Sequence, residues 1–292
     1  MMTRLKTGRE QAFLSGSDAS SSGIPARTRR TIMRSMLLPC LMVTLVGQAN
    51  AQSTSTLNDP VLPPPLPKRG PRPQAFVPPG WAIETQLSGD INDDGVADVV
   101  LVLKKNAPQP AHKQRRKHED LSWNTDVRLL VGLYKNQASQ DYTLGFTNAT
   151  LIPPRTLPDM TNRLSGITLR KGLLKIDINL FMAMGGWAAY DKSFKFRPDG
   201  GCLRLIGIDL HEYERNRIRY TKLSANYLTG KVNVLYGIHS TSKALLAKQE
   251  QLQLRMRSKQ APCIDQVGDG ETFLPELTTP LPSMEAWRAV PD

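Results

Sequence analysis

The 292-residue sequence is poor in the features that identify most enzymes and membrane proteins. It has three cysteines, and no spacing of cysteine and histidine suggests a zinc site. The apolar run at residues 36–46 is shorter than the roughly 20 residues that a membrane-spanning helix needs. No G-x-S-x-G, H-E-x-x-H or P-loop motif occurs, so the sequence indicates no common catalytic class.

The N-terminal segment has the composition of a secretory signal. Several arginines precede the apolar run at 36–46, and Ala49 and Ala51 occupy the two positions that a signal peptidase recognises. We expect residues 1–51 to be a signal peptide with an upstream extension, cleaved near Ala51. The mature chain would then lie in the periplasm or be secreted, with no transmembrane helix. Twin-arginine export fits the paired arginines, and ordinary export from an internal start at Met33 fits equally.

Basic residues outnumber acidic ones by 38 to 26, a net charge of +12. Without residues 1–51 the numbers are 31 and 24, a net charge of +7, which is typical of a soluble exported protein with a basic face. Export also argues against nucleic acid as a partner. The strongest basic cluster consists of Lys113, Arg115, Arg116 and Lys117. It is either a solvated loop or a possible anion-binding site for phosphate or acidic glycan.

Only two cysteines remain after the signal, Cys202 and Cys263. In an oxidising compartment they are expected to form one disulfide, and the alternative is two unpaired thiols. Closing a loop of this length stabilises a protein by about 4 kcal/mol in the chain-entropy model.

The chain divides into four parts by composition. From Pro60 to Pro79, nine of twenty residues are proline, which is typical of an extended spacer without a packed core. We therefore assign residues 52–80 to a Pro-rich disordered linker, 81–262 to a β domain, and 263–292 to a C-terminal tail on its surface.

Alternation of apolar and polar residues indicates strands in the third part. The pattern runs through residues 166–182 and 193–214, each with a central turn, and through 250–258. A one-residue shift of the apolar face suggests a bulge near Gly207. Because strands follow strands without helices between them, the predicted fold is mainly β, a single antiparallel β domain that is sandwich-like or a meander.

One loop carries a pattern typical of calcium ligands. Positions 1, 3, 5 and 9 of the stretch "DINDDGVAD" are Asp90, Asn92, Asp94 and Asp98. Calcium binds six to eight oxygen atoms, Gly95 at position 6 permits a sharp turn, and the Val96 carbonyl suits position 7. Position 12 is Leu101 instead of the glutamate of an EF-hand. An Asx-rich turn without metal is the alternative.

The stretch resembles the calcium loop of FG-GAP and VCBS-type repeats, in which a loop leads directly into a strand. The resemblance implies that Asp90, Asn92, Asp94 and Asp98 are side-chain ligands and Val96 a backbone ligand. One copy is present, so the expectation is a single calcium site on a β domain and not a propeller. The chain also resembles a group of uncharacterised exported proteins of Gram-negative bacteria, which implies no activity.

These features predict an exported, calcium-stabilised, non-enzymatic β domain that acts as a binding or structural module of the cell envelope. Its partner would be an envelope protein or glycan. The alternative is a hydrolase acting on envelope polysaccharide or peptidoglycan, for which carboxylates or a histidine should meet in a pocket away from the loop. His211 is one candidate acid or base, although its alternating segment also fits a solvated strand face.

Overall fold

The computed structural model describes residues 64–106, 112–116, 119–123, 125–183, 186–215, 219–238 and 249–281, with strands 112–116 and 119–123 described by their backbone alone. All of them belong to one compact unit, 54–292. The unit is mainly β with antiparallel sheets, which confirms the predicted fold class. The residues of the expected signal peptide, 1–51, lie outside the described residues.

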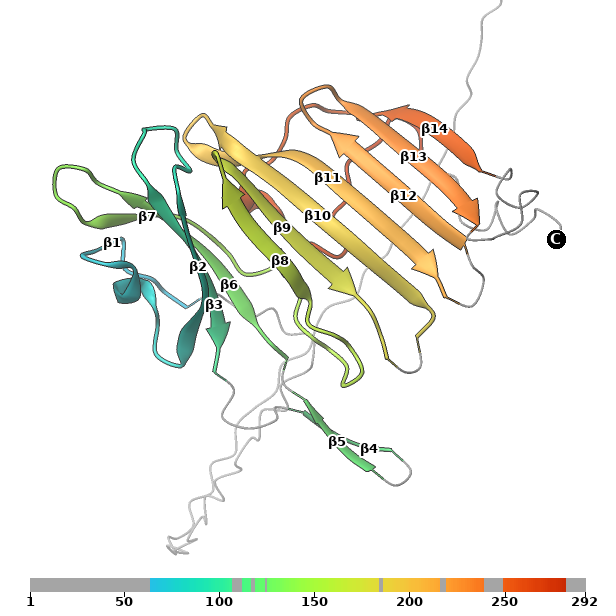
Figure 1. The fold of residues 1–292 in the computed structure, drawn as a ribbon, viewed down its shortest axis with the longest axis horizontal. Helices are drawn as coiled ribbons and strands as arrows, with labels where there is room; N and C mark the ends of the chain where they lie inside the picture. Colours follow the sequence, from blue (N-terminus) through green and yellow to red (C-terminus); the bar gives the residue numbers. More distant parts are fainter. Residues whose placement is uncertain are drawn as a thin grey trace, which may run out of the picture. The chain divides into compact units, whose positions relative to one another are not determined.

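The first sheet has five strands in the order β1-β7-β6-β3-β2 (Figure 1). Its strands are β1 (Arg69–Gly70), β2 (Trp81–Gly89), β3 (Asp98–Lys105), β6 (Arg128–Lys135) and β7 (Tyr142–Asn148). The strands β4 (His112–Arg116) and β5 (Glu119–Trp123) form a separate hairpin between β3 and β6. The side chains of Lys113, Arg115 and Arg116 on β4, and all of Lys117, lie outside the described residues.

The second sheet is a seven-stranded meander in which each strand pairs with the next one in sequence. Its strands are β8 (Leu164–Arg170), β9 (Leu173–Leu180), β10 (Ala188–Asp199), β11 (Cys202–Glu214), β12 (Arg219–Asn226), β13 (Lys231–Ile238) and β14 (Glu250–Arg255). The register between β10 and β11 shifts at Lys195/Phe196, opposite Gly207 and Leu205. This confirms the predicted bulge near Gly207.

The central strands β3 and β6 of the five-stranded sheet are buried on both faces, which explains why β3 is a continuous apolar run. Val100 and Val102 face a core shared with the seven-stranded sheet, whereas Leu101 and Leu103 face a second core. The second core is closed by residues 64–77, where the short 3₁₀ helix η1 (Pro73–Phe76) buries Phe76 completely. The proline-rich spacer, expected to reach residue 80, therefore ends earlier. This segment contributes one buried aromatic, Phe76, and the two-residue strand β1. A segment this short shows no repeating apolar pattern from which its packing could be predicted.

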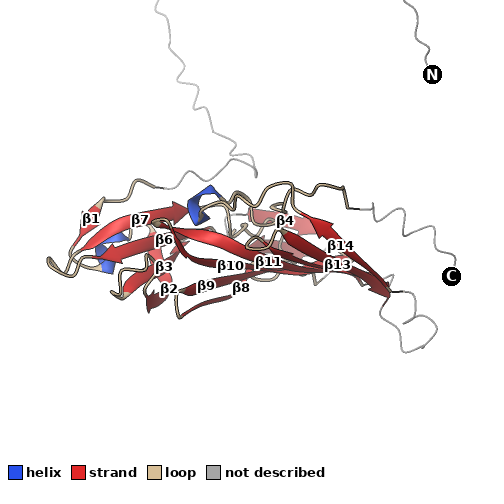
Figure 2. Ribbon diagram, turned by 90° about the horizontal axis from the view of Figure 1, so that it is seen from above, coloured by secondary structure: helices blue, strands red, loops and turns tan. Residues whose placement is uncertain are grey.

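The seven-stranded sheet is covered on one face by the strap, our name for residues 256–281. Figure 2 shows loops along the upper side of β10–β14. The strap contains the 3₁₀ helix η2 (Ile264–Gln266) and buries Ile264 and Val267 in the shared core. This part of the expected surface tail is thus packed into the domain. Among the described residues neither short helix has the length or apolarity to cross a bilayer.

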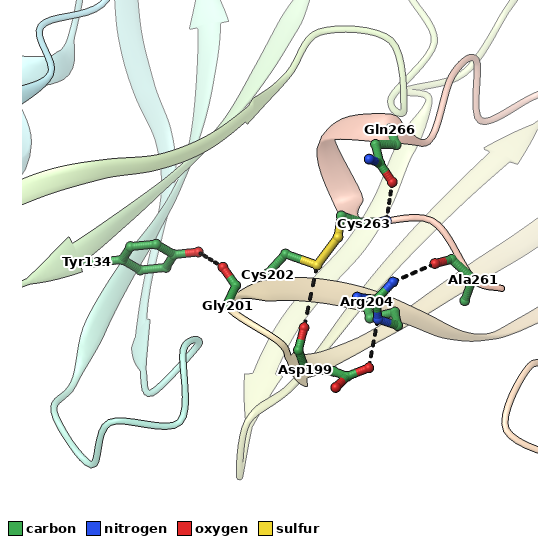
Figure 3. The surroundings of a disulfide bond; sticks show 8 residues. All are labelled: Tyr134, Asp199, Gly201, Cys202, Arg204, Ala261, Cys263 and Gln266. Carbon is green, nitrogen blue, oxygen red and sulfur yellow. Dashed lines mark hydrogen bonds and ion pairs between the residues drawn. A yellow bond between two sulfur atoms is a disulfide. The ribbon is translucent and has the colours of Figure 1, made fainter.

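The predicted disulfide joins Cys202, at the start of β11, to Cys263, directly before η2 (Figure 3). The bond links residues 61 positions apart, and the alternative of two unpaired thiols is wrong. Close by, the Arg204 guanidinium donates hydrogen bonds to the Asp199 carboxylate and the Ala261 carbonyl, at 2.7 and 2.8 Å. Covalent and polar contacts therefore fix the beginning of the strap.

Two fully buried cations hold the later part of the strap. The Lys192 ammonium donates hydrogen bonds to the carbonyl oxygens of Glu271 and Phe273, and Arg163 forms a 2.8 Å ion pair with the Glu271 carboxylate. The Arg163 guanidinium also donates to the Tyr190 hydroxyl and lies 5.4 Å from the centre of its ring. Buried charges require such partners because their desolvation is costly.

Candidate functional site

The predicted calcium loop connects β2 to β3, two neighbouring antiparallel strands. Two of its residues have left-handed backbone conformations, Asp93 with φ 66° and Gly95 with φ 80°. Glycine adopts this conformation without strain, and aspartate tolerates it better than most residues. The loop therefore turns sharply at the position where the motif places its glycine.

The Asp90 carboxylate organises the loop from its first position. It accepts hydrogen bonds from the backbone N–H groups of Asn92, Asp93 and Gly95, at 3.2, 2.7 and 2.9 Å. Partial burial acts to raise the pKa of the Asp90 carboxyl, but these N–H donors favour its charged form and together hold the pKa below its ordinary value. Asp90 therefore stays ionised at neutral pH.

The side chains of Asn92 and Asp94 meet on the same loop. The Asn92 amide donates a 2.8 Å hydrogen bond to one Asp94 oxygen, and the second Asp94 oxygen accepts the Val96 N–H at the same distance. The Asn92 oxygen accepts the Asp94 N–H at 3.1 Å. Three of the predicted side-chain ligands, at positions 90, 92 and 94, thus share one network of hydrogen bonds.

Asp98, the fourth predicted side-chain ligand, lies fully buried at the first residue of β3. Its two oxygens accept the N–H groups of Lys135 and Ile91, at 2.8 and 3.1 Å, so it joins the loop to β6. Burial raises the pKa of the Asp98 carboxyl. The two N–H donors oppose this effect, and the negative charges of Asp94 and Asp90 add to it. The three carboxylates are close enough to repel one another.

The loop lies at the seam, our name for the junction where β2 meets β8. The Asp90 backbone faces the turn at Gly172 between β8 and β9, and the Gly89 backbone packs on the Leu169 side chain. A hollow of about 520 Å³ opens here, lined from the loop by Asp90 and Asp93 and from the second sheet by Lys171 and Arg197. The loop therefore contributes to the contact between the sheets.

The donor set suits calcium in its chemistry. Asp90, Asn92 and Asp94 offer oxygen atoms, which are the ligands that hard divalent cations prefer. Val96 follows directly, and its carbonyl is the expected backbone ligand. In the described part of the chain, however, no three His, Cys, Asp or Glu side chains are grouped as a ready metal site. The calcium assignment stays a prediction.

A second site was missed by sequence reasoning. The face of the seven-stranded sheet opposite the strap contains a hollow of about 400 Å³ across five strands, β10–β14. Its polar lining includes Asp191, Asp209, His211, Lys222, Asn233 and Gln251. The signal was present in the sequence, because alternate residues of these strands are polar. Only the register shows that they face one hollow.

Cross-strand pairing aligns this lining into rows. Asp191 lies opposite His211, His211 opposite Lys222, Lys222 opposite Leu235, and Leu235 opposite Gln251. His211 is thus on the exposed side of the sheet, where its ring packs against those of Tyr213 and Tyr220, with ring centres 5.3 and 5.9 Å apart. His211 was expected on a solvated strand face. The structure places it on the polar face of the sheet, but half-buried and with its Nε2 atom buried.

Comparison with known proteins gives no match: no family model, no curated protein and no solved structure resembles the chain. The inference of function therefore rests on the two sites described above.

Proposed function

We propose that this protein is an exported, calcium-stabilised, non-enzymatic β domain that serves as a binding or structural module of the cell envelope. The observation that supports it best is the gathering of Asp90, Asn92 and Asp94 into one hydrogen-bonded loop at the seam between two sheets. An ion held there would stabilise the contact between the sheets, and it would leave the exposed sheet face available to a partner.

Electrostatics favours a cation in this loop. Three carboxylates lie close together, and two of them act on the third through their charge. Calcium would neutralise this repulsion while keeping the loop closed, and it tolerates the irregular geometry that a short loop provides. The exported location proposed for the chain is consistent with calcium, because extracellular modules bind it with dissociation constants of about 0.1–1 mM.

Thermal unfolding with and without calcium tests the proposal. At a calcium concentration ten times the dissociation constant, linkage predicts about 1.4 kcal/mol of stabilisation. For a domain of this size that raises the melting temperature by roughly 3–6 °C. The variant Asp90→Ala with Asp94→Ala should lose this rise.

The matched control is Asp93→Asn, which removes a loop carboxylate outside the predicted ligand set. Asparagine tolerates the positive φ of this position, so the control should keep the rise. If the unmodified protein shows no rise at millimolar calcium, the ion assignment is wrong.

The open-face hollow favours a second candidate, a hydrolase of envelope polysaccharide or peptidoglycan. Two carboxylates, Asp191 and Asp209, and His211 line the same hollow, away from the calcium loop. However, Asp209 is already engaged by the Lys195 ammonium and the Ser224 hydroxyl. Burial acts to raise the pKa of Asp209, but these hydrogen bonds and the Lys195 charge together hold the pKa below its ordinary value, so Asp209 is unsuited to act as a general acid.

The two candidates differ in whether the ligand is cleaved. A hydrolase should release new reducing ends from polysaccharide or peptidoglycan and lose this activity in Asp191→Asn. A binding module should release none. Activity that depends on Asp191 would replace the non-enzymatic proposal.

A further inference from the structure

We propose that the open face of the seven-stranded sheet binds a neutral, polyhydroxylated glycan chain, which rests on the proposed function as an envelope binding module and specifies its ligand. The hollow on β10–β14 is the site. The ligand class follows from the charge balance of the lining, from its hydrogen-bonding groups and from the length of the rows.

The charges of the hollow nearly cancel. The Lys195 ammonium pairs with the Asp209 carboxylate. Of the other lining residues, the Asp191 carboxylate and the Lys222 ammonium carry opposite charges. A polyanion would meet two carboxylates and a polycation would meet one or two ammonium groups, so like-charge contacts disfavour both. A neutral ligand meets no such penalty.

The hydrogen-bonding groups fit hydroxyls. The side-chain amides of Asn233 and Gln251 are exposed, and they form no side-chain hydrogen bond with another described residue. Each amide offers both a donor and an acceptor, Asp191 adds acceptors and Lys222 adds donors. A hydroxyl both donates and accepts, so a polyhydroxylated ligand satisfies all of them. The aliphatic side chain of Leu235, which lies between Lys222 and Gln251 in the row, can pack on the C–H groups of a sugar ring.

The shape of the face suits an extended chain. Strands in a sheet are about 4.8 Å apart, so a row across the five strands β10–β14 spans about 19 Å.

At one end of the hollow, aromatic rings border the row. Gly237 leaves space for the Tyr220 ring, because a Cβ atom at this position would lie 2.5 Å from it. The Lys222 ammonium lies 5.3 Å from the centre of the same ring. The ring thus supports two lining residues, His211 and Lys222.

Titration of tetrasaccharides tests the inference. The probes are cellotetraose, chitotetraose and mannotetraose as neutral ligands and a heparin tetrasaccharide as the anionic one, observed by saturation-transfer NMR. At least one neutral probe should bind, and its affinity should persist at high salt because no net charge is neutralised. The double variant Asn233→Ala with Gln251→Ala should weaken this affinity about tenfold, as expected for the loss of two hydrogen bonds.

Gln86→Ala is the matched control. Gln86 is an exposed amide on β2, in the other sheet, and it does not line the hollow. Its removal should change the affinity less than twofold. The inference fails if no neutral probe binds, if only heparin binds and salt abolishes it, or if the double variant binds as tightly as the unmodified protein.

The calcium experiment separates this inference from the proposed function. The melting temperature of the double variant should rise with calcium as that of the unmodified protein does, because neither substitution touches the loop. If calcium stabilises the protein but no neutral probe binds, only the glycan inference is wrong. If a neutral probe binds through Asn233 and Gln251 but calcium has no effect, the ion assignment is wrong and the glycan site remains.

Discussion

The two sheets of this protein differ in how many of their faces are covered. The five-stranded sheet is covered on one side by residues 64–77 and on the other by the core that it shares with its neighbour. The seven-stranded sheet has the strap on one face and, among the described residues, polar side chains and a hollow on the other. The comparison shows that the central strands of one sheet are interior, whereas the other sheet leaves one face exposed, and this exposed face is the one that we propose as the ligand site.

The largest expected effect comes from breaking an ion pair in the interior sheet. Arg128 is buried, and its guanidinium donates two hydrogen bonds, of 2.6 and 2.8 Å, to the Glu84 carboxylate. Glu84→Ala leaves this charge without its carboxylate, and we expect a loss of about 3–5 kcal/mol in the free energy of unfolding. Asp209→Ala on the open sheet removes the partner of Lys195, whose side chain is 36% exposed, and should cost about 0–1 kcal/mol. Urea denaturation of both variants measures the difference.

The double variant Glu84→Leu with Arg128→Met serves as the control. It removes both charges together, so most of the lost stability should return. Equal costs for Glu84→Ala and Asp209→Ala would contradict the division between an interior sheet and an exposed one.

The next effect concerns the cover of the seven-stranded sheet. Replacing Cys202 and Cys263 by serine releases the start of the strap, and it should lower the free energy of unfolding by about 2–4 kcal/mol. Urea denaturation with and without dithiothreitol is the measurement. The reductant should destabilise the unmodified protein by a similar amount and leave the double variant unchanged. If it leaves both unchanged, the disulfide does not support the strap.

The sequence allows the strands and the disulfide to be predicted because both depend on local information. The alternation of apolar and polar residues identifies the buried face of a strand, and two cysteines can form one intramolecular disulfide. The segments that cover the two sheets, residues 64–77 and the strap, could not be predicted in this way. Phe76 and Ile264 reach their cores from segments with few apolar residues. The open-face hollow depends on a register that runs across five strands. A calcium loop could be proposed from sequence because the spacing of its expected ligands lies within nine residues.

Long-range contacts also determine the smallest of the expected effects, which concerns Lys192. This residue is central in β10, where its inward neighbours on the same strand are Tyr190 and Phe194, and sequence alone gives no partner for its charge. The strap supplies two carbonyl oxygens. Burial lowers the pKa of Lys192 to about 8, although the nearby carboxylates of Asp269, Glu271 and Glu212 act in the opposite direction. Part of the cost of burying the ammonium therefore remains at neutral pH.

The sign of the pH dependence follows from proton binding. An unfolded lysine has a pKa of about 10.4, so between roughly pH 8 and pH 10 the unfolded chain holds a proton that the folded chain has released. The free energy of unfolding should therefore rise with pH in this window, by on the order of 1–3 kcal/mol relative to Lys192→Met. Tyr190 has a pKa raised mainly by burial, which would reduce stability at still higher pH, so the measurements stay below pH 10.

Lys222→Met on the open face is the control. Lys222 is exposed on the face that the strap does not cover, so the difference in the free energy of unfolding between that variant and the unmodified protein should not change with pH. If the difference in the free energy of unfolding between Lys192→Met and the unmodified protein also does not change with pH, the strap does not exclude water from Lys192. The covered face and the open face would then not differ at this position.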